Sequence, residues 1–376
     1  MEYKLEDICI LITDGSHFSP KGEPVGYPML SVKDMREYGF DYSNCKYISK
    51  NDFEIMKKSG CVPKKGDVLV AKDGSYMKEI FVCNESKEEA ILSSIALFRP
   101  NTKIIIPEFL CYLLKTPIVY NYIRNNCVSG SALPRIILRS FRAIKIDIPN
   151  IKIQNKIVNI LCAIDKKIKC NNEINDNLQQ QVKYMYDELI NVDINRLPNG
   201  FKLVPFSEIA DVMSGKRPGS RSPNMDDNNR YPLVGAATIM GYTNNYNYNE
   251  KILIIGRVGT HGIIQRFSEP CWASDNTLII TSNYYEFIAQ YLKSIDYSSM
   301  NRGSTQPLIT QCDLKKKNVV IPDLTQLNEF EKVASSLMKE YDSNIIQNKK
   351  LSVLRDSLLP KLMSGEIDVS NIKIEL

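Results

Sequence analysis

The chain repeats one short pattern in its two halves. A segment of the form Gly-Ser-x-x-Pro-x-Ile occurs at Gly130–Ile136 and again at Gly303–Ile309. Each copy runs into a basic, apolar stretch that ends in Ile-Pro, at Ile148-Pro149 and at Ile321-Pro322, with the same offset of nearly half the 376 residues. A long segment with helical periodicity follows each copy. The sequence therefore predicts a tandem duplication of a globular part followed by a long helix, which suits a target with two related halves.

Composition places the chain among ordinary globular proteins. The length of 376 residues suits two or three domains with sizeable cores, and the hydrophobic content of 43% and the charged content of 24% are ordinary. No apolar run approaches the length of a membrane span, and the N-terminus lacks the features of a signal peptide. The 10 cysteines stand singly and only 2 histidines are present, so a structural zinc site is not expected. We expect reduced, mostly buried cysteines in a cytoplasmic protein.

The positive charge is concentrated outside the long helical segments. The net charge is only +5, but residues 128–146 carry four basic side chains and no acid. A second cluster contains Lys216, Arg217 and Arg221. Such patches fit a phosphate backbone as partner, although a solvated surface would have the same composition.

Each globular part is expected to be a mixture of strands and helices. In residues 1–149, short apolar runs predict strands at 67–71 and 91–98, and Pro107 with Glu108 predicts the start of a helix over 107–114. Residues 195–322 repeat this order. There the strands are expected at 251–255 and 277–281 and the helix at 286–293, after a turn-rich linker over 195–200.

The two remaining segments, 150–194 and 323–376, have heptad periodicity. Apolar residues alternate at intervals of three and four, and asparagines occupy slots near the middle of each seam. Because neither stripe can be buried against one small domain, we expect the two helices to pair with each other, antiparallel, with Asn348 facing Asn171 or Asn175. The predicted seam of the first helix contains Ile157, Leu161, Ile164, Ile168, Asn171, Asn175, Leu178, Val182, Met185 and Leu189. That of the second contains Phe330, Val333, Leu337, Tyr341, Ile345, Asn348, Leu351, Leu354, Leu358 and Leu362.

The order of these motifs resembles the specificity subunit of type I restriction-modification systems over essentially the whole chain. The motifs are Asp14-Gly15-Ser16-His17, the two Gly-x-x-x-Pro-x-Ile segments, Ile-Pro followed by Gln154-Asn155-Lys156-Ile157 or by Gln326, Ile164–Ile168, and Leu354–Leu359 through Gly365. The first copy has Ala132-Leu133 where the second has Thr305-Gln306, and the spacing from Ile-Pro to glutamine differs by one residue. These departures concern loop detail.

The resemblance implies an α+β fold with an internal pseudo-twofold repeat. It implies two target recognition domains, 1–149 and 195–322, separated by an antiparallel coiled coil of a central helix, 150–194, and a C-terminal helix, 323–376. It further implies a non-catalytic reader of double-stranded DNA, one domain for each half of a split target. Two methyltransferase subunits would dock on it, restriction subunits could join, and S-adenosylmethionine, ATP and magnesium would belong to those partners.

Candidate DNA contacts are basic or polar residues in loops of the two globular parts. Lys72 and Arg257 each follow a short strand and precede a glycine-containing turn, where the backbone can approach a phosphate and arginine can read guanine. A plain turn with a solvated charge is the alternative for both, and His17 could equally cap its own turn. Arg135 and Arg139 could bind phosphate or acids of a methyltransferase. The full set of candidates is His17, Lys72, Ser75, Arg135, Arg139, Lys216, Arg217, Arg257, His261 and Arg302.

Tyrosines and asparagines interleave over residues 242–248, as in a polar–aromatic reading loop or, alternatively, a half-buried strand edge.

Two other classes of function were weighed. The sequence contains no Asn-Pro-Pro-Tyr or Asp-Pro-Pro-Tyr motif for adenine methylation, no glycine-rich cofactor loop and no Walker loop, so an enzyme acting alone is disfavoured. A coiled-coil scaffold that binds only proteins shares the helices, but it leaves the basic globular surfaces unexplained.

Overall fold

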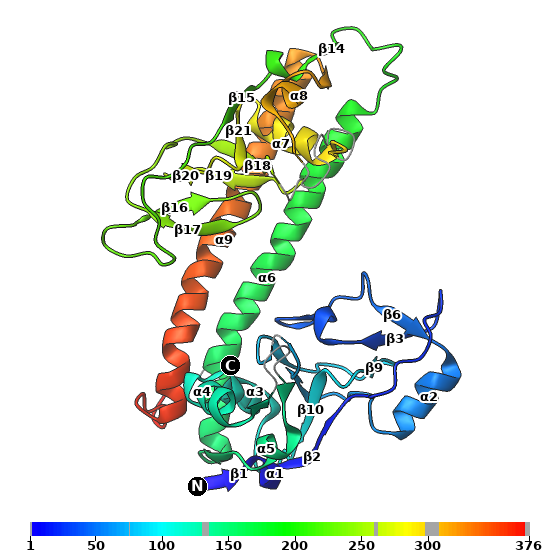
Figure 1. The fold of residues 1–376 in the computed structure, drawn as a ribbon, viewed down its shortest axis with the longest axis vertical. Coiled ribbons are helices and arrows are strands. Elements are labelled where there is room, and N and C mark those ends of the chain that lie inside the picture. Colours follow the sequence, from blue (N-terminus) through cyan, green and yellow to red (C-terminus); the bar gives the residue numbers. More distant parts are fainter. Residues whose placement is uncertain (1, 75, 130–134, 259–261, 298–307, 373–376) are drawn as a thin grey trace. The chain divides into compact units, whose positions relative to one another are not determined.

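The computed structural model describes residues 2–74, 76–129, 135–258, 262–297 and 308–372 (Figure 1). The chain divides into two compact units. The first contains Met1–Lys169 and Asn348–Leu376, and the second contains Cys170–Gln347. Each unit therefore holds one globular part and one end of each long helix.

The first unit is built on an antiparallel sheet with the order β2-β10-β7-β8 and a smaller sheet with the order β6-β3-β9. Its strands are β1 (Glu2–Lys4), β2 (Cys9–Asp14), β3 (Tyr27–Leu30), β4 (Met35–Arg36), β5 (Gly39–Phe40), β6 (Lys46–Ile48), β7 (Val68–Ala71), β8 (Ile80–Val82), β9 (Ala90–Ile91), β10 (Ile95–Pro100), β11 (Val128–Ser129), β12 (Arg135–Ile136) and β13 (Lys145–Asp147). Its short helices are α1 (Leu5–Ile8), η1 (Val32–Asp34), α2 (Lys50–Lys58), α3 (Pro107–Lys115), α4 (Pro117–Asn126) and α5 (Leu138–Arg142).

The second unit repeats this topology. Its four-stranded sheet has the order β15-β21-β18-β19, and its three-stranded sheet has the order β17-β16-β20. In both units the central strand of the small sheet pairs with one neighbour in parallel and with the other antiparallel. The elements are β14 (Lys202–Pro205), η2 (Phe206–Glu208), β15 (Asp211–Ser214), β16 (Tyr231–Val234), β17 (Ile239–Thr243), β18 (Ile252–Gly256), β19 (Gln265–Phe267), β20 (Trp272–Ala273), β21 (Thr277–Thr281), α7 (Tyr285–Ser294), α8 (Gln311–Lys315) and β22 (Asn318–Ile321).

Most elements expected from the sequence form close to their predicted positions. β7, β18 and β21 occupy the three runs of buried apolar residues, and α3 begins at Pro107, whose missing N–H is not needed in the first helical turn. The expected strand over 91–98 is wrong in one respect. A turn after Ile91 divides it, so that β9 joins the small sheet and β10 the large one. An apolar run alone does not show that the chain changes sheet within it.

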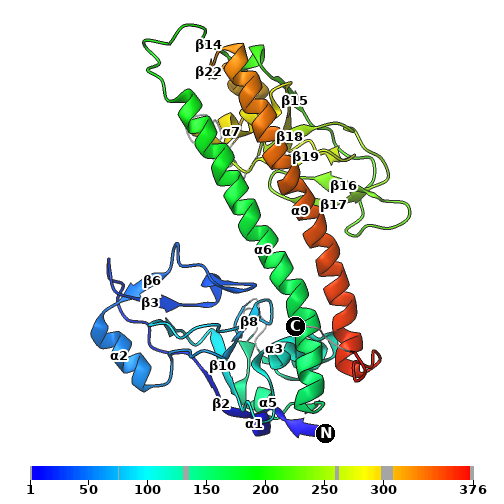
Figure 2. The same ribbon diagram turned by 180° about the vertical axis from the view of Figure 1, so that it is seen from behind.

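The long helices are α6 (Ile151–Ile190) and α9 (Leu324–Ser364), and they lie side by side within each unit (Figures 1 and 2). In the first unit, Ile157 and Leu161 near the start of α6 share a core with Leu359 and Leu362 near the end of α9. In the second unit, Val182 and Tyr186 near the end of α6 share a core with residues near the start of α9, namely Phe330, Ala334 and Met338. The two helices therefore run antiparallel.

The C-terminal end of α9 contains a proline. Pro360 lies inside the last turns of the helix, which continues to Ser364. Gly365 follows with φ of 78°, the left-handed conformation in which glycine commonly ends a helix.

The seam of α9 corrects the sequence prediction at three positions. Ile345 is 46% exposed, and the neighbouring Asn344 takes its place by donating from Nδ2 to Oδ1 of Asn175 at 3.0 Å. Val333 and Leu354 are also exposed, where Ala334 and Arg355 face the partner helix instead. The prediction followed the largest apolar residues, whereas the helix geometry places small and polar ones at these slots.

Buried asparagines on α6 find amide and carbonyl partners. Asn171 donates from Nδ2 to Oε1 of Gln347 at 2.7 Å, and Asn175 donates to the carbonyl oxygen of Tyr341 at 3.4 Å. These contacts satisfy amide donors that would otherwise be costly to bury. Asn348 belongs to the first unit and both asparagines to the second, so the pairing expected of Asn348 stays a prediction.

Among the described residues, no helix is both long enough and apolar enough to cross a membrane. All ten cysteines lie among the described residues as free thiols, and six of them are buried.

Candidate nucleic-acid interface

Strand ends bring together several of the candidate residues in the first unit. β2 ends at Asp14 and β7 ends at Ala71, directly before Lys72. The backbone N–H of Lys72 donates to the carbonyl of Ser94 at 2.8 Å, and the N–H of Ile136 donates to the carbonyl of Lys72 at 3.1 Å. These bonds place residues from distant parts of the sequence in one surface. We call this surface the first edge, and it consists of Asp14, Ser16, His17, Lys72, Asp73 and Arg135.

The second unit builds an equivalent surface with the same backbone bonds. The N–H of Arg257 donates to the carbonyl of Asn276 at 2.8 Å, and the N–H of Ile309 donates to the carbonyl of Arg257 at 3.0 Å. Lone bridges pair Asp73 with Arg135 in one unit and Val258 with Leu308 in the other. The second edge consists of Ser214, Lys216, Arg217, Arg257, Val258 and Leu308, which correspond in this order to the six residues of the first edge.

A glycine without room for a side chain stands at the start of each edge. A Cβ on Gly15 would lie 2.2 Å from the carbonyl oxygen of Ile91, and a Cβ on Gly215 would lie 2.0 Å from that of Ser274. Neither position accepts any other residue without moving the backbone. Both edges therefore depend on the same close approach of two chain segments, which is independent of the charges they carry.

The first edge is electrically balanced. The Nζ atom of Lys72 lies 3.3 Å from Oδ2 of Asp14 and 3.2 Å from Oδ1 of Asp73, and its side chain is only 9% exposed. His17 projects outward with its side chain 77% exposed, and its Nε2 lies 3.3 Å from Oδ2 of the same Asp14. The charge of Lys72 is thus largely compensated within the protein, while His17 is open to a partner.

The second edge is cationic. It contains three basic residues and no acid, because Ser214 and Val258 stand where the first edge has Asp14 and Asp73. Lys216 and Arg217 are exposed, and Arg257 is half-buried. The Nε of Arg257 has no hydrogen-bond partner among the residues that the structure describes. Such a surface suits anionic or hydrogen-bond-accepting groups of a ligand.

The remaining candidates fall into two groups. Arg135 and Arg139 are exposed, whereas Arg142, in the same basic stretch, donates from Nη2 to the carbonyl of Ile12 at 2.7 Å and so anchors α5. Outside the described residues lie Ser75, His261 and Arg302, together with most of the two Gly-Ser-x-x-Pro segments.

The tyrosine–asparagine segment is partly structural. Asn247 donates from Nδ2 to the carbonyl of Ala273 at 3.1 Å and accepts from the N–H of the same residue at 2.8 Å, which fixes the loop to β20. Tyr246 packs edge-on against Tyr231 with ring centroids 5.0 Å apart. Tyr242 belongs to β17. The structural alternative, a half-buried strand edge, thus accounts for much of this segment.

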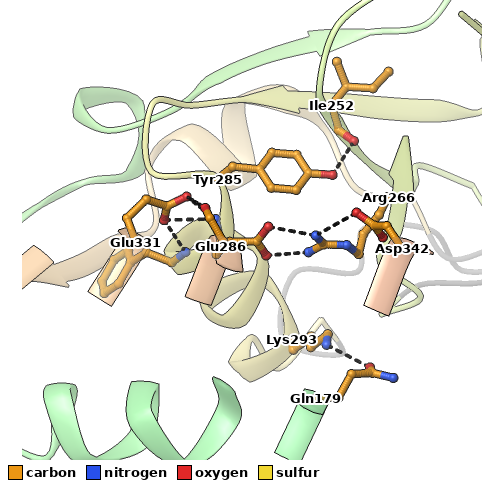
Figure 3. A network of polar contacts seen from close by, with 10 residues as sticks. Gln179, Ile252, Arg266, Tyr285, Glu286, Lys293, Glu331 and Asp342 are labelled. Carbon is orange, nitrogen blue, oxygen red and sulfur yellow. Dashed lines mark hydrogen bonds and ion pairs between the residues drawn. The ribbon is translucent and has the colours of Figure 1, made fainter. Parts of the chain in front are cut away.

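A buried ion pair within the second globular part lies next to the contacts that join this part to α9 (Figure 3). Arg266 of β19 donates to both carboxylate oxygens of Glu286 at 2.6 and 2.8 Å. Glu331 of α9 accepts from the backbone N–H groups of Glu286 and Phe287, at the first turn of α7. Burial raises the pKa of the Glu331 carboxyl, and the two N–H donors oppose this shift.

A comparable set of contacts attaches the first globular part to its helices. Arg355 of α9 lies 2.9 Å from Asp165 of α6 and 2.8 Å from Glu37, and the hydroxyl of Tyr112 in α3 donates to Asp165. Sequence patterns identified neither network, because the partners are far apart in the chain. Arg355 gave no signal either, because the heptad pattern assigns the neighbouring Leu354 to the seam.

No group of three or more histidine, cysteine, aspartate or glutamate side chains suitable for a metal ion occurs among the described residues.

Comparisons with known proteins agree with this architecture. The family model for the type I restriction modification DNA specificity domain matches residues 1–180 and 198–355. The chain is 22% identical to the type I restriction enzyme HindI specificity subunit of Haemophilus influenzae, covering 87% of this chain and 91% of that protein. It is 23% identical to the MjaVIII specificity subunit of Methanocaldococcus jannaschii, covering 92% and 87%. The crystal structure of the type I restriction-modification S subunit from M. genitalium superposes with a TM-score of 0.63 at 16% identity, covering 96% and 95%.

The duplicated α+β units and the paired long helices define a two-domain specificity protein. The chain belongs to the family of type I restriction-modification specificity subunits, and it carries two copies of the DNA specificity domain. Subunits of this kind are non-catalytic, and the cofactors of the system belong to the modification and restriction subunits.

Proposed function

We propose that this subunit reads a split target in double-stranded DNA, with one recognition domain for each half. The domains are residues 1–149 and 195–322, and the connecting segments are residues 150–194 and 323–376. The observation that supports this proposal most strongly is the pair of equivalent edges, because the same backbone bonds present different side chains in the two halves. One scaffold with two sets of side chains is what independent reading of two half-sequences requires.

The helix pair would serve as the frame of the complex. α6 alone has 40 residues, which corresponds to roughly 60 Å at about 1.5 Å per residue. Two methyltransferase subunits would dock on this frame and restriction subunits would join them in the cytoplasm, where the DNA is. The spacing between the half-sequences would then follow from protein geometry.

Within each domain, the residues proposed to contact DNA are the exposed and cationic ones. In the first domain these are His17, Arg135 and Arg139, together with Lys72 and with Ser75, which follows Lys72 by three residues in the sequence. In the second domain these are Lys216, Arg217 and Arg257, together with His261 and Arg302, which are candidates from the sequence. Arginine and lysine supply both phosphate contacts and guanine readout, so these residues could position the duplex as well as read it.

Binding of the assembled complex to DNA at several salt concentrations would test this proposal. The complex of this subunit with its methyltransferase should bind one set of sequences tightly, and its affinity should fall steeply with salt because phosphate contacts release counterions. The methyltransferase without this subunit is the control. If the complex bound all duplexes equally, or if the subunit added no DNA affinity, the chain would be a protein scaffold and the proposal would be wrong.

A further inference from the structure

The two edges share a backbone but carry different hydrogen-bonding chemistry at one exposed position. His17 in the first edge corresponds to Arg217 in the second, and each is the third residue after the end of its strand, following Gly15-Ser16 or Gly215-Lys216. The N–H groups at Ser16 and Lys216 donate to equivalent carbonyls, those of Ile91 and Ala273. A residue at this position therefore projects from the same place in both domains.

In the first edge, the surrounding contacts determine which nitrogen of His17 can face a ligand. Oδ2 of Asp14 lies 3.3 Å from Nε2 of His17. A carboxylate only accepts hydrogen bonds, so this contact favours the tautomer with the proton on Nε2 and leaves Nδ1 as an acceptor. The tautomer is inferred from this contact, since hydrogen positions follow from the hydrogen-bond network.

The carboxylate that orients His17 is itself fixed. Lys72, which is nearly buried, holds Asp14 at 3.3 Å and Asp73 at 3.2 Å. The hydroxyl of Ser16 braces the same turn from the other side, donating to the carbonyl of Phe18 at 2.9 Å and accepting from its N–H at 3.1 Å. A chain of contacts thus runs from Lys72 through Asp14 to the exposed imidazole of His17.

We propose that His17 reads an exocyclic amino group of a base in the first half-sequence, that of adenine or cytosine, through Nδ1 as acceptor. Asp14 and Lys72 are positioning residues for this contact. Arg217, at the same place in the second domain, can only donate, so it selects acceptors, either phosphate oxygens or the O6 and N7 atoms of guanine. This inference rests on the proposed reading of DNA by the two domains and names the group that each exposed position recognises.

The test uses the complete complex and duplexes that contain its recognition sequence, identified as the motif that the complex methylates. Each adenine and cytosine of the first half-sequence is replaced in turn by the analogue that lacks the exocyclic amino group. One analogue should weaken binding of the unaltered complex by about 2- to 12-fold, the worth of one neutral hydrogen bond. The variant His17→Phe should bind more weakly to the natural target and lose its sensitivity to that one analogue. If the unaltered complex and the His17→Phe complex respond equally to every analogue, the role of His17 is overturned.

A second variant examines the positioning role without removing the reader. Asp14→Ala releases His17 but leaves Lys72 paired with Asp73, so the domain should remain folded, as thermal unfolding would show. It should lose sensitivity to the same analogue as His17→Phe, and retained sensitivity would contradict the orienting contact.

In the second domain, Arg217→Met should reduce the slope of log affinity against log salt by about 1 if Arg217 binds phosphate. If Arg217 reads guanine instead, the loss should be confined to one base pair, and no loss of either kind would overturn its assignment.

Failure of this inference and failure of the proposed function give different results. If the domain does not read DNA, the unaltered complex shows no preference for any base of the first half-sequence. If only the inference is wrong, the preference persists and is unaffected by His17→Phe. Lys202→Met, which removes an exposed cation on β14 outside the second edge, is the matched control for Arg217→Met.

Discussion

Breaking the ion pair between Arg266 and Glu286 should destabilise the second unit strongly. The Glu286 side chain is 1% exposed and that of Arg266 is 16% exposed, so neither charge can regain its full hydration if the other is removed. Replacing Arg266 by methionine leaves a buried, unpaired carboxylate, a change that typically costs about 3–5 kcal/mol. We therefore expect Arg266→Met to lower the free energy of unfolding of this unit by that amount.

The double variant separates the pair from its surroundings. Arg266→Met with Glu286→Met replaces both charges by apolar side chains of similar length, and such replacements are often neutral or stabilising. The double variant should therefore recover most of the lost stability, which gives a large coupling energy in a double-mutant cycle.

Fluorescence of the single tryptophan makes this measurement specific. Trp272 lies in β20 of the second unit, so urea unfolding followed by its emission reports on that unit. The exposed pair of Lys183 and Asp187 on α6 is the control, and breaking it should cost only about 0.3–0.5 kcal/mol. A loss below about 1 kcal/mol for Arg266→Met, or a double variant as unstable as the sum of the single ones, would refute the reasoning from burial.

Three further predictions concern single sites. Arg257→Ala should weaken specific binding of the complex by about 1–3 kcal/mol if it reads a base, or lower affinity evenly across sequences if it holds phosphate; unchanged affinity would assign it to a solvated turn. Asn175→Leu should destabilise the helix pair by about 1–3 kcal/mol because Asn344 loses its acceptor. The double variant Asn175→Leu with Asn344→Leu should restore stability but allow methylation at altered half-site spacing, which sequencing of methylated sites would reveal. The pKa of Glu331 is raised in the folded state, so the free energy of unfolding should fall as the pH rises above the unfolded pKa of about 4.5. Glu331→Gln should flatten that decline, and identical pH profiles of stability for the two proteins would contradict this prediction.

Local patterns predicted the secondary structure well where one pattern governs one element. β21 occupies the expected residues because Thr277–Thr281 is a short, buried, β-branched run, and α3 follows its Pro-Glu start. Prediction failed where position depends on the partner. Val333, Ile345 and Leu354 are the bulkier apolar choices for the α9 seam, yet the antiparallel packing turns Ala334, Asn344 and Arg355 inward.

The candidate interface was predictable in its residue types but not in its electrostatics. Lys72 and Arg257 looked alike in the sequence, since each follows a strand and precedes a glycine turn. The sequence already places Asp73 after Lys72 and Val258 after Arg257, but only the fold brings Asp14 to Lys72. A pairing between segments so distant in the chain has no local signal, so the full compensation of the Lys72 charge emerges from the structure.

Exchange of one recognition domain tests the central claim most directly. Residues 200–322 would be replaced by the corresponding domain of another type I specificity subunit, and the methylated motif of cells carrying the hybrid complex would be mapped by sequencing. The account predicts that one half of the motif changes to that of the donor, while the other half and the spacing stay as they were. A change in both halves, or a hybrid that methylates the original motif unchanged, would contradict the claim that each domain reads its own half of the target.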